Sequence, residues 1–508
     1  MMTTTDTPIR KLLVCGLGRS GKAVAHAALT AGLFDGLAQM TIVDGEDSPE
    51  LRESFAELER LAADRKPALT LRAAFGVTAL PEEAQGPFEL GVISPGFAPA
   101  DPLTVSARRC CAELISELEF AWRLAPATQQ WVAITGSNGK TTTTLLVAHL
   151  LRGAGRSVAS VGNIGEPVTN VFLQADAAPD ILVVEASSFQ LDFTTSFAPQ
   201  AAALLNVTPD HLNWHGSLEN YAAAKRKIFA HQHPGDLAVI WEADPFAPDA
   251  RAQIAATSAT LQTVSLRPCA PPSAYLGDDG RLWLHTDAHD APQALCRAGE
   301  LPIKGEHNIL NALFAACLAT HLGLTPAEIT AGLMSFAAPA HRLELVAEVA
   351  GVRYYDDSKA TNPDSVRAAL TAFAQGEAHL LVGGRGKGTP YDDLARVALP
   401  RVRALYAFGE EGPALAAAFS AVQAQLGTVT PITICEKLAD AVAAAAEAAT
   451  PGEAVVLSPA CASFDEFHSY AERGEVFAAL VRERAHGAGA ATSAPPAATA
   501  GKRCGAER

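Results

Sequence analysis

A glycine-rich loop with a lysine and two threonines is the part of the sequence best suited to bind phosphate. The segment Thr135–Thr142 reads TGSNGKTT and lies between the apolar run Trp131–Ile134 and a helical stretch predicted from Thr143. Glycines let successive backbone N–H groups turn toward one point, and a helix N-terminus adds positive potential there. Ile134 stands where the common nucleotide-loop pattern has a glycine. The order of strand, loop, lysine, hydroxyl and helix nevertheless favours phosphate binding over a plain Gly-Asn turn.

The side chains of this loop have distinct predicted roles in binding a triphosphate. Lys140 is expected to contact the β and γ phosphates, and the Thr141 hydroxyl to ligate magnesium. The carboxylate that ends the apolar run Ile181–Glu185 could hold the same ion or satisfy backbone donors at a helix N-terminus. Because a triphosphate loop needs a metal ligand nearby, we predict that Glu185 binds magnesium. The predicted nucleotide-binding residues of the loop are Gly136, Ser137, Asn138, Gly139, Lys140, Thr141 and Thr142.

Three further clusters each allow a functional and a structural interpretation. His211 follows an apolar strand and could ligate a second cation, or could only form hydrogen bonds. The basic cluster Lys225–Lys227 lies on a predicted helix and would by default form a solvated surface. Asn308 and Asn311 share one helix face, where their amides could bind a purine edge or cap the preceding turn.

Two polar segments lie near and after a presumed domain boundary at residues 337–340. Arg342 directly follows this boundary and could clamp transferring phosphoryl oxygens when domains close. Asp356–Pro363 then gathers two acids, a lysine and two hydroxyls in one turn. An N-cap accounts for part of that polarity, but a purely structural loop seldom needs so much.

A second glycine loop, Gly16–Gly21, follows the first predicted strand and has the spacing of the dinucleotide fingerprint. Asp44 is the expected ribose or base partner, although it lies 44 − 16 = 28 residues beyond the first glycine rather than about 20. A nicotinamide cofactor, a nucleotide-linked substrate and a tight turn are equally compatible with this loop alone.

The elements that must position these residues alternate between short apolar strands and alanine-rich helical stretches. This alternation predicts an α/β fold with mostly parallel sheets. Boundaries are expected at residues 125–128 and 337–340, and the weakly periodic stretch 242–302 is left unassigned. Residues 486–508 lack the apolar area to fold and are predicted to be a disordered tail. The clearest strands are Lys11–Cys15, Met40–Val43, Leu90–Ile93, Trp131–Thr135, Ile181–Glu185, Ala202–Asn206, His379–Val382, Ala404–Phe408 and Ala454–Leu457.

Composition excludes several classes of protein. The 508 residues are 49% hydrophobic and carry a formal charge of −16, so a disordered chain and a nucleic-acid-binding protein are both disfavoured. The nine cysteines contain no Cys-x-x-Cys pair, which argues against a zinc or disulfide framework. With no apolar targeting segment and no run long enough to span a membrane, we expect a cytoplasmic protein.

Taken together, the motifs resemble those of the Mur ligases of peptidoglycan synthesis, most closely the members that add D-glutamate. The resemblance extends over residues 11–485. The motifs that carry it are Gly16–Gly21, Ser94–Gly96, Thr135–Thr142, Gly162–Gly165, Glu185–Gln190, Asn206–His211, His307–Asn311, Asp356–Asn362, Gly383–Lys387 and Ser458–Asp465.

The resemblance implies a three-domain α/β enzyme. Residues 1–126 would form a Rossmann-like domain for the UDP substrate, 127–339 a P-loop ATPase-like domain for ATP, and 340–485 a Rossmann-like domain for the amino acid. The implied activity is an ATP-dependent amide ligase that adds D-glutamate to UDP-N-acetylmuramoyl-L-alanine through acyl phosphate and tetrahedral intermediates. The expected enzyme uses two Mg²⁺ ions and closes its domains around the substrates. It is expected to be a monomer that binds neither nucleic acid nor membrane.

The resemblance also assigns residues. The Gly16 loop would face UDP rather than a nicotinamide, and Lys225 matches a carbamylated lysine that shares the second Mg²⁺ with His211. The implied UDP-substrate residues are Ser20, Asp44, Ser94, Pro95, Gly96 and Asn163, and the further ATP residues are Asn308, Asn311, Arg342 and Asp357. The implied glutamate residues are Lys359, Thr361, Lys387, Ser463 and Tyr470. The catalytic residues would be Lys140, His211, Lys225 and Arg342, and the metal ligands Thr141, Glu185, His211 and the Lys225 carbamate.

The chain departs from the family pattern at a few positions, and two other functions compete with this interpretation. Asn213 and Trp214 replace a common Asp-Arg pair, Tyr470 replaces a phenylalanine, and Arg385 replaces an acid. A ligase similar to folylpolyglutamate synthetase would share the central loop but would not explain the Gly16 loop. A non-catalytic nucleotide switch would leave Lys225, His211 and the Asp356 turn unexplained.

Overall fold

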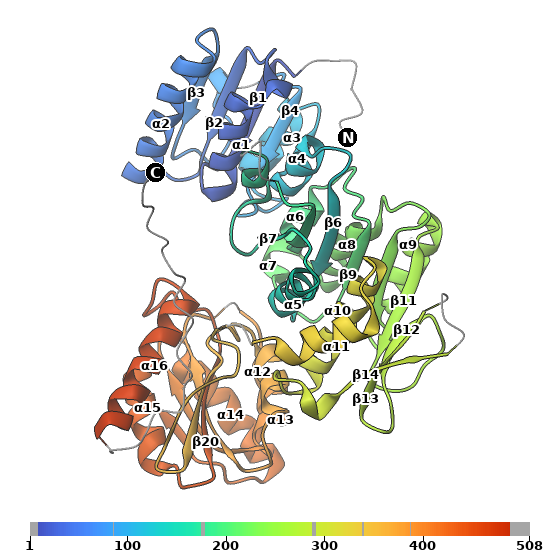
Figure 1. The fold of residues 1–508 in the computed structure, drawn as a ribbon. Helices are drawn as coiled ribbons and strands as arrows, with labels where there is room; N and C mark the ends of the chain where they lie inside the picture. The colour runs from blue at the N-terminus through green and yellow to red at the C-terminus, as the bar shows by residue number, and fades with distance from the viewer. Residues whose placement is uncertain are drawn as a thin grey trace, which may run out of the picture. The chain divides into compact units, whose positions relative to one another are not determined.

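Three sheets flanked by helices make up the described parts of the chain (Figure 1). The structure is a computed structural model that describes residues 9–84, 86–173, 178–286, 291–337, 340–386 and 388–487. The chain divides after Ala337 into two compact units, of which the first contains two sheets and the second one. The parallel-rich α/β class predicted from the sequence is confirmed. No helix among the described residues is long and apolar enough to cross a membrane.

The first sheet is all parallel and is covered on both faces. Its elements are β1 (Lys11–Cys15), α1 (Arg19–Thr30), η1 (Gly32–Phe34), β2 (Gln39–Val43), α2 (Pro49–Arg65), β3 (Thr70–Ala74), η2 (Glu82–Ala84), β4 (Leu90–Ile93), α3 (Pro102–Cys110), β5 (Leu114–Ser116) and α4 (Glu117–Leu124). The strand order is β3-β2-β1-β4-β5. Helices α1, α2 and α4 pack on one face and α3 on the other, which explains why strands β1 and β4 are almost wholly apolar.

The second sheet carries the phosphate-loop motif. Its elements are β6 (Gln130–Thr135), α5 (Lys140–Gly153), β7 (Val158–Gly162), η3 (Val168–Leu173), β8 (Ile181–Glu185), α6 (Ser188–Asp192), β9 (Ala201–Leu204), α7 (Leu212–His215), α8 (Leu218–Arg226), η4 (Lys227–Phe229), β10 (Leu237–Trp241), α9 (Ala247–Thr257), β11 (Thr260–Ser265), β12 (Ser273–Leu276), β13 (Arg281–His285), β14 (Gln293–Arg297), η5 (Ala298–Glu300), α10 (Glu306–His321) and α11 (Pro326–Ser335). The strand order is β14-β13-β12-β11-β10-β9-β6-β8-β7, with antiparallel pairing only at β12-β13 and β13-β14. Helices α5, α10 and α11 cover one face, and α8 and α9 cover the other.

The third sheet forms the second unit. Its elements are β15 (Glu344–Val349), β16 (Val352–Asp356), α12 (Pro363–Leu370), β17 (Ala378–Gly383), α13 (Asp392–Ala398), β18 (Val402–Phe408), α14 (Gly412–Leu426), β19 (Ile432–Ile434), α15 (Leu438–Ala448), β20 (Ala454–Ala460) and α16 (Tyr470–Gly487). The strand order is β15-β16-β20-β17-β18-β19, and only β15 is antiparallel to its neighbour. Helices α12, α13 and α14 pack on one face, and α15 and α16 on the other.

All nine predicted strands are present, but three predicted boundaries are wrong. Strand β9 ends at Leu204, not at Asn206, because the next residues turn away to contact the phosphate loop. Helix α5 begins at Lys140 rather than Thr143, and α16 continues to Gly487, past the predicted start of the tail. The rest of that tail, residues 488–508, lies outside the described residues. The unassigned stretch 242–302 contains α9, four short strands and η5.

Helix α4 joins the first two sheets, since it contributes Leu118 to the core of the second and Phe120 to that of the first. Between them Glu119, whose side chain is fully buried, accepts hydrogen bonds from three successive backbone N–H groups at residues 195–197, at 3.0–3.1 Å. Arg123 Nε donates to the same carboxylate at 2.9 Å. The carboxylate therefore fixes the loop after α6 against α4.

We predict that Glu119→Ala lowers the free energy of unfolding of the first unit by about 3 kcal/mol, because it leaves buried donors and a cation unpaired. Urea unfolding followed by fluorescence measures this change. Glu57→Ala is the matched control, since the pair between Glu57 and Lys22 is exposed and should contribute little to stability. Equal, small losses in both variants would contradict the role of Glu119.

Candidate active site

The turn between β6 and α5 has the shape expected of a phosphate cradle. Strand β6 is buried from Trp131 to Thr135 and leads into four loop residues before α5 begins. Gly139 caps the helix at φ 85°, and a Cβ there would lie 2.5 Å from Asn311 Oδ1. Only glycine fits this left-handed, crowded position. The loop thus brings backbone N–H groups to the N-terminus of a 14-residue helix, where an anion is favoured.

Residues after β9 fix the conformation of this loop. Asn206 Oδ1 accepts the backbone N–H of Asn138 at 2.8 Å, and Asn206 Nδ2 donates to the Asn138 carbonyl at 3.1 Å. Ser137 Oγ donates to the Thr208 carbonyl at 3.0 Å and accepts the Thr208 N–H at 2.9 Å. These paired contacts join the loop to the segment that follows β9 and fix its backbone.

A hydroxyl and a carboxylate meet beside the loop. Thr141 Oγ1 donates to Glu185 Oε2 at 2.8 Å, and Asn163 Nδ2 donates to Glu185 Oε1 at 2.8 Å. Glu185 is 2% exposed. Hydroxyl and carboxylate oxygens are the ligands that Mg²⁺ prefers, so this pair fits the predicted metal site. Asn163, expected at the UDP substrate, lies next to this pair.

Lys140 and Lys225 both point at the loop backbone. Lys140 Nζ donates to the carbonyls of Gly136 at 2.8 Å and Ser137 at 3.0 Å. Lys225 Nζ donates to the same Gly136 carbonyl at 2.7 Å and is only 1% exposed, so its default prediction as a solvated surface residue is wrong. Burial, together with the nearby Lys140, lowers the pKa of Lys225 well below its usual value, against the opposing effect of Asp210 and Glu185. The amine is therefore biased toward its neutral, nucleophilic form.

His211 sits at the N-terminus of α7 with φ 53° and lies against Phe189 at a ring separation of 4.8 Å. Its Nε2 is 3.5 Å from Asp210 Oδ2. Trp214, one of the departures from the family pattern, also packs on Phe189, at 4.5 Å. Burial lowers the pKa of the neighbouring His215 to about 4, so its imidazole is neutral at pH 7. Tyr221 links these rings to Lys225, because its ring centre lies 4.3 Å from Lys225 Nζ and 6.2 Å from the His211 ring centre.

The two asparagines predicted to share a helix face are in contact on α10. Asn311 Nδ2 donates to Asn308 Oδ1 at 3.1 Å, and Asn311 Oδ1 accepts from Thr143 Oγ1 at 3.2 Å. Asn308 also donates to the Lys304 carbonyl at 2.8 Å. The structure therefore links both asparagines to α5, the helix that follows the phosphate loop, while Thr142 lies buried one residue before this contact.

In the first sheet, the Gly16 loop is closed by two of the predicted substrate residues. Asp44 Oδ2 accepts the Leu17 N–H at 2.7 Å, and Ser94 Oγ donates to the Gly16 carbonyl at 3.2 Å. Ser20 lies in the first turn of α1, and Pro95 and Gly96 follow β4 on the same side of the sheet. The loop therefore forms a shallow cluster at the carboxyl ends of β1, β2 and β4, where parallel sheets bind ligands.

In the second unit, the charge of Arg342 acts on Asp357, another residue predicted to bind ATP. Asp357 Oδ2 accepts from Ser458 Oγ at 2.7 Å and Oδ1 from the Leu343 N–H at 3.3 Å. Burial raises the pKa of Asp357 to about 7, although Ser458 and the charge of Arg342 act in the opposite direction. A carboxyl so close to ionisation at neutral pH is characteristic of a functional site.

The predicted glutamate residues are also gathered in this unit. Lys359 Nζ lies 3.8 Å from the centre of the Tyr470 ring, and the Thr361 N–H donates to the Lys359 carbonyl at 2.8 Å. Ser463 is 2% exposed and begins the turn that leads to α16. Lys387 lies outside the described residues. Arg385, another departure from the family pattern, pairs with Glu410 at 3.0 Å.

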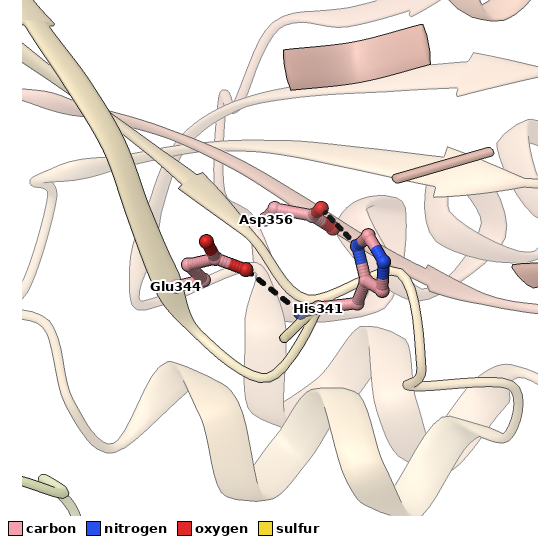
Figure 2. Close-up of side chains that lie close together, drawn as sticks. All are labelled: His341, Glu344 and Asp356. Carbon is pink, nitrogen blue, oxygen red and sulfur yellow. Dashed lines mark hydrogen bonds and ion pairs between the residues drawn. The ribbon is translucent and has the colours of Figure 1, made fainter. Parts of the chain in front are cut away.

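A histidine and two carboxylates meet where the second unit begins, as Figure 2 shows. His341 Nδ1 lies 2.7 Å from Asp356 Oδ2, and the His341 N–H donates to Glu344 Oε2 at 3.0 Å. One side-chain nitrogen or oxygen atom of each residue lies within 4.8 Å of the others, a spacing that a metal ion could use. Hydrogen bonds already join the three residues, however. Gly474 of α16 permits this packing, since a Cβ there would lie 2.2 Å from His341 Nδ1. The cluster fixes the backbone that leads into Arg342.

Two residues were not predicted from the sequence. Asn206 fixes the phosphate loop, and Arg473 is completely buried beside the proposed glutamate residues. The role of Asn206 could not be recognised, because an asparagine after a strand is common in ordinary turns. Gly474, a glycine inside a helical stretch, signals close packing of this helix, but a Cβ there would meet His341 and Asp356, so it does not predict the burial of Arg473.

The pKa of His341 is raised, chiefly by its hydrogen bond to Asp356 and further by Glu344 and Glu475. Because the folded value exceeds the unfolded value of about 6.5, this contribution to stability is complete below the unfolded pKa and is lost as pH rises through the folded pKa. We therefore expect His341→Asn to cost the second unit more unfolding free energy at about pH 5.5 than at about pH 9. Urea titrations at both pH values test this, and an identical loss at the two would refute it.

Comparison with known proteins extends the likeness over nearly the whole chain. The Mur ligase middle domain matches residues 134–319, and the Mur ligase glutamate ligase domain matches residues 341–461. MurF from Acinetobacter baumannii has the same fold, with a TM-score of 0.58 at 18% identity, over 87% of this chain and 90% of that chain.

Two curated relatives are more similar in sequence. The UDP-N-acetylmuramoylalanine–D-glutamate ligase of Thermobifida fusca strain YX is 38% identical over 481 residues, which cover 93% of this chain and 98% of the relative. The ligase of the same name from Frankia casuarinae is 39% identical over 474 residues, covering 93% and 94%. The chain therefore belongs to the Mur ligase family, among its UDP-N-acetylmuramoylalanine–D-glutamate ligases.

Proposed function

We propose that this chain uses ATP to join D-glutamate to UDP-N-acetylmuramoyl-L-alanine. The observation that carries the proposal is the 38% identity to a ligase named for this reaction, over 98% of that relative's length. The cradle at Gly136–Gly139 and the Thr141–Glu185 pair support it, because they are the parts that an ATP-dependent ligase needs.

The proposed reaction has two steps. A carboxylate oxygen of the alanyl group attacks the γ-phosphorus of ATP, the bond to ADP breaks, and an acyl phosphate forms. The amine of D-glutamate then attacks the acyl carbon, a tetrahedral intermediate forms, and phosphate leaves as the amide is completed. No protein nucleophile is required, so the residues act by positioning and by charge stabilisation.

Each group in the first unit has a proposed role. The loop N–H groups and Lys140 bind the β and γ phosphates, with Asn308 and Asn311 alongside the nucleotide. Thr141 and Glu185 would hold one Mg²⁺, which neutralises charge on the phosphates when bound. We propose His211 and a carbamate on Lys225 as ligands of a second ion. An amine whose pKa is lowered by burial reacts with CO₂ more readily than an exposed lysine, and the resulting anionic oxygens suit a hard cation.

The remaining proposed roles follow the location of each group. The UDP substrate would bind at the Gly16 loop through Ser20, Asp44 and the segment Ser94–Gly96, with Asn163 nearby. In the second unit, Arg342 and Asp357 would complete ATP binding. Glutamate would bind through Lys359, Thr361, Lys387, Ser463 and Tyr470.

The competing functions explain less of the chain. A folylpolyglutamate synthetase-like ligase and a nucleotide switch both leave the first sheet and its Gly16 loop without a role. We further propose a monomeric, cytoplasmic enzyme. The cysteines among the described residues are all free thiols, which suits a reducing compartment.

Phosphate release in the presence of ATP and UDP-N-acetylmuramoyl-L-alanine tests the proposal directly. D-glutamate, L-glutamate, L-lysine and diaminopimelate should be offered in parallel, and we expect turnover with D-glutamate alone. Mass spectrometry of the product should show one added glutamyl residue. Turnover with another amino acid, or release that needs no amino acid, would overturn the proposed specificity.

The carbamate proposal makes a separate prediction. Lys225→Ala should reduce turnover by about a hundredfold or more, because the proposed ligand to the second ion is lost. Formate or acetate should restore part of the activity by supplying the missing carboxylate. Lys227→Ala is the matched control and should retain turnover, since Lys227 contacts Asp192 rather than the loop. Undiminished turnover in Lys225→Ala would exclude the carbamate.

A further inference from the structure

A completely buried arginine stands at the start of α16 in the second unit. Arg473 is 0% exposed, although arginine is seldom fully buried in proteins unless it is paired. Taking a guanidinium out of water is costly unless its donors are satisfied. The burial of Arg473 therefore depends on the hydrogen-bond partners of its N–H groups.

The donors of Arg473 contact neutral oxygens of three loops. Nε donates to Ser358 Oγ at 2.9 Å, and Nη2 donates to the carbonyls of Ser358 at 2.9 Å and Cys461 at 3.1 Å. Nη1 donates to the carbonyls of Ala462 at 3.2 Å and Gly383 at 3.4 Å. Burial lowers the pKa of Arg473 to about 10, so the side chain remains a cation at neutral pH.

These acceptors lie at or just after the carboxyl ends of β16, β20 and β17, which are neighbours in the sheet. Two of these segments carry proposed glutamate residues, because Ser358 precedes Lys359 and Ala462 precedes Ser463. Ser358 Oγ also donates to the Tyr470 carbonyl at 2.8 Å, and this hydrogen bond joins the start of α16 to the loop after β16. One side chain thus contacts all three segments, in addition to the backbone hydrogen bonds between Arg385 and Ala462 and from the Ala460 N–H to the Ala360 carbonyl.

The packing leaves little freedom around the guanidinium. A Cβ at Gly384, where φ is 125°, would lie 2.9 Å from Arg473 Nη1 and 2.1 Å from the Ala462 carbonyl. The loop after β17 therefore approaches Arg473 only because it carries a glycine there. Planar, forked donors suit this arrangement of several carbonyls, whereas the point charge of a lysine does not.

We infer that Arg473 is a positioning residue for the amino-acid substrate, holding the Lys359 and Ser463 loops at the spacing that a dicarboxylate needs and adding buried positive charge behind them. This inference rests on the proposed function, since it assigns glutamate to these loops. Every hydrogen bond described for the guanidinium goes to a hydroxyl or carbonyl oxygen. The nearby carboxylates of Asp356, Asp465 and Glu466 offset part of its charge through space, and the remaining positive potential favours an anionic ligand.

Steady-state kinetics of Arg473→Lys tests the inference, with each of the three substrates varied in turn. We expect the KM for D-glutamate to rise about tenfold or more, and those for ATP and the UDP substrate to change less than about threefold. Hydrogen exchange should quicken at the amides of residues 358–362 and 461–464. Arg482→Lys, an exposed arginine of the same helix, is the matched control and should change neither measurement.

Two results would overturn the inference: an unchanged KM for D-glutamate in a folded Arg473→Lys, or a parallel rise in all three KM values. If Arg473→Lys does not fold, Ser358→Ala replaces it, and we expect a rise of about threefold confined to D-glutamate. An unchanged KM in Ser358→Ala would then count against the inference. If the wild-type chain does not use D-glutamate, the proposed function fails, while the exchange rates still decide whether Arg473 holds the loops.

Discussion

The close packing of side chains around the turn from β6 to α5 is the constraint on which the first unit depends. Gly139 has no space for a side chain, and Asn206 and Ser137 fix the loop through paired hydrogen bonds. Two amines point at the loop from α5 and α8, and Glu185 reaches it from the adjacent strand β8. Hydrogen bonds within the protein therefore fix the backbone of the loop, and a site fixed in this way keeps the entropic cost of binding low.

In the second unit, other buried polar contacts fix the loops of the proposed site. Two of its proposed ligand residues, Lys359 and Ser463, lie on loops after the adjacent strands β16 and β20, and loops alone hold side chains less precisely than helices or strands. Arg473 joins these loops through carbonyl groups, while His341 and Asp356 fix the entry to Arg342. Arg473 belongs to α16, and the His341–Asp356 pair packs against the same helix, where Gly474 allows the close approach. Stability and site geometry are therefore supplied by the same buried polar contacts.

Sequence patterns predicted the strands, the α/β class and the order of the ligand motifs, because apolar runs and glycine turns are local signals. They placed Thr141 near Glu185 through the general rule that parallel strands bind ligands at their carboxyl ends. They could not show that Lys225 is buried, since its burial depends on α8 packing against the loop carbonyl of Gly136. Arg473 was missed for the same reason. Its partners lie 11 to 115 residues away, and no local spacing encodes such contacts.

The central claim is that the Gly136–Gly139 cradle binds the phosphates of ATP and that Thr141 and Glu185 hold a magnesium ion there. A crystal structure with Mg²⁺ and a non-hydrolysable ATP analogue tests it most directly. The account predicts phosphate density against the loop N–H groups and Lys140, with an ion contacting Thr141 and Glu185. Analogue density at any other place in the chain, with the cradle empty, would contradict it.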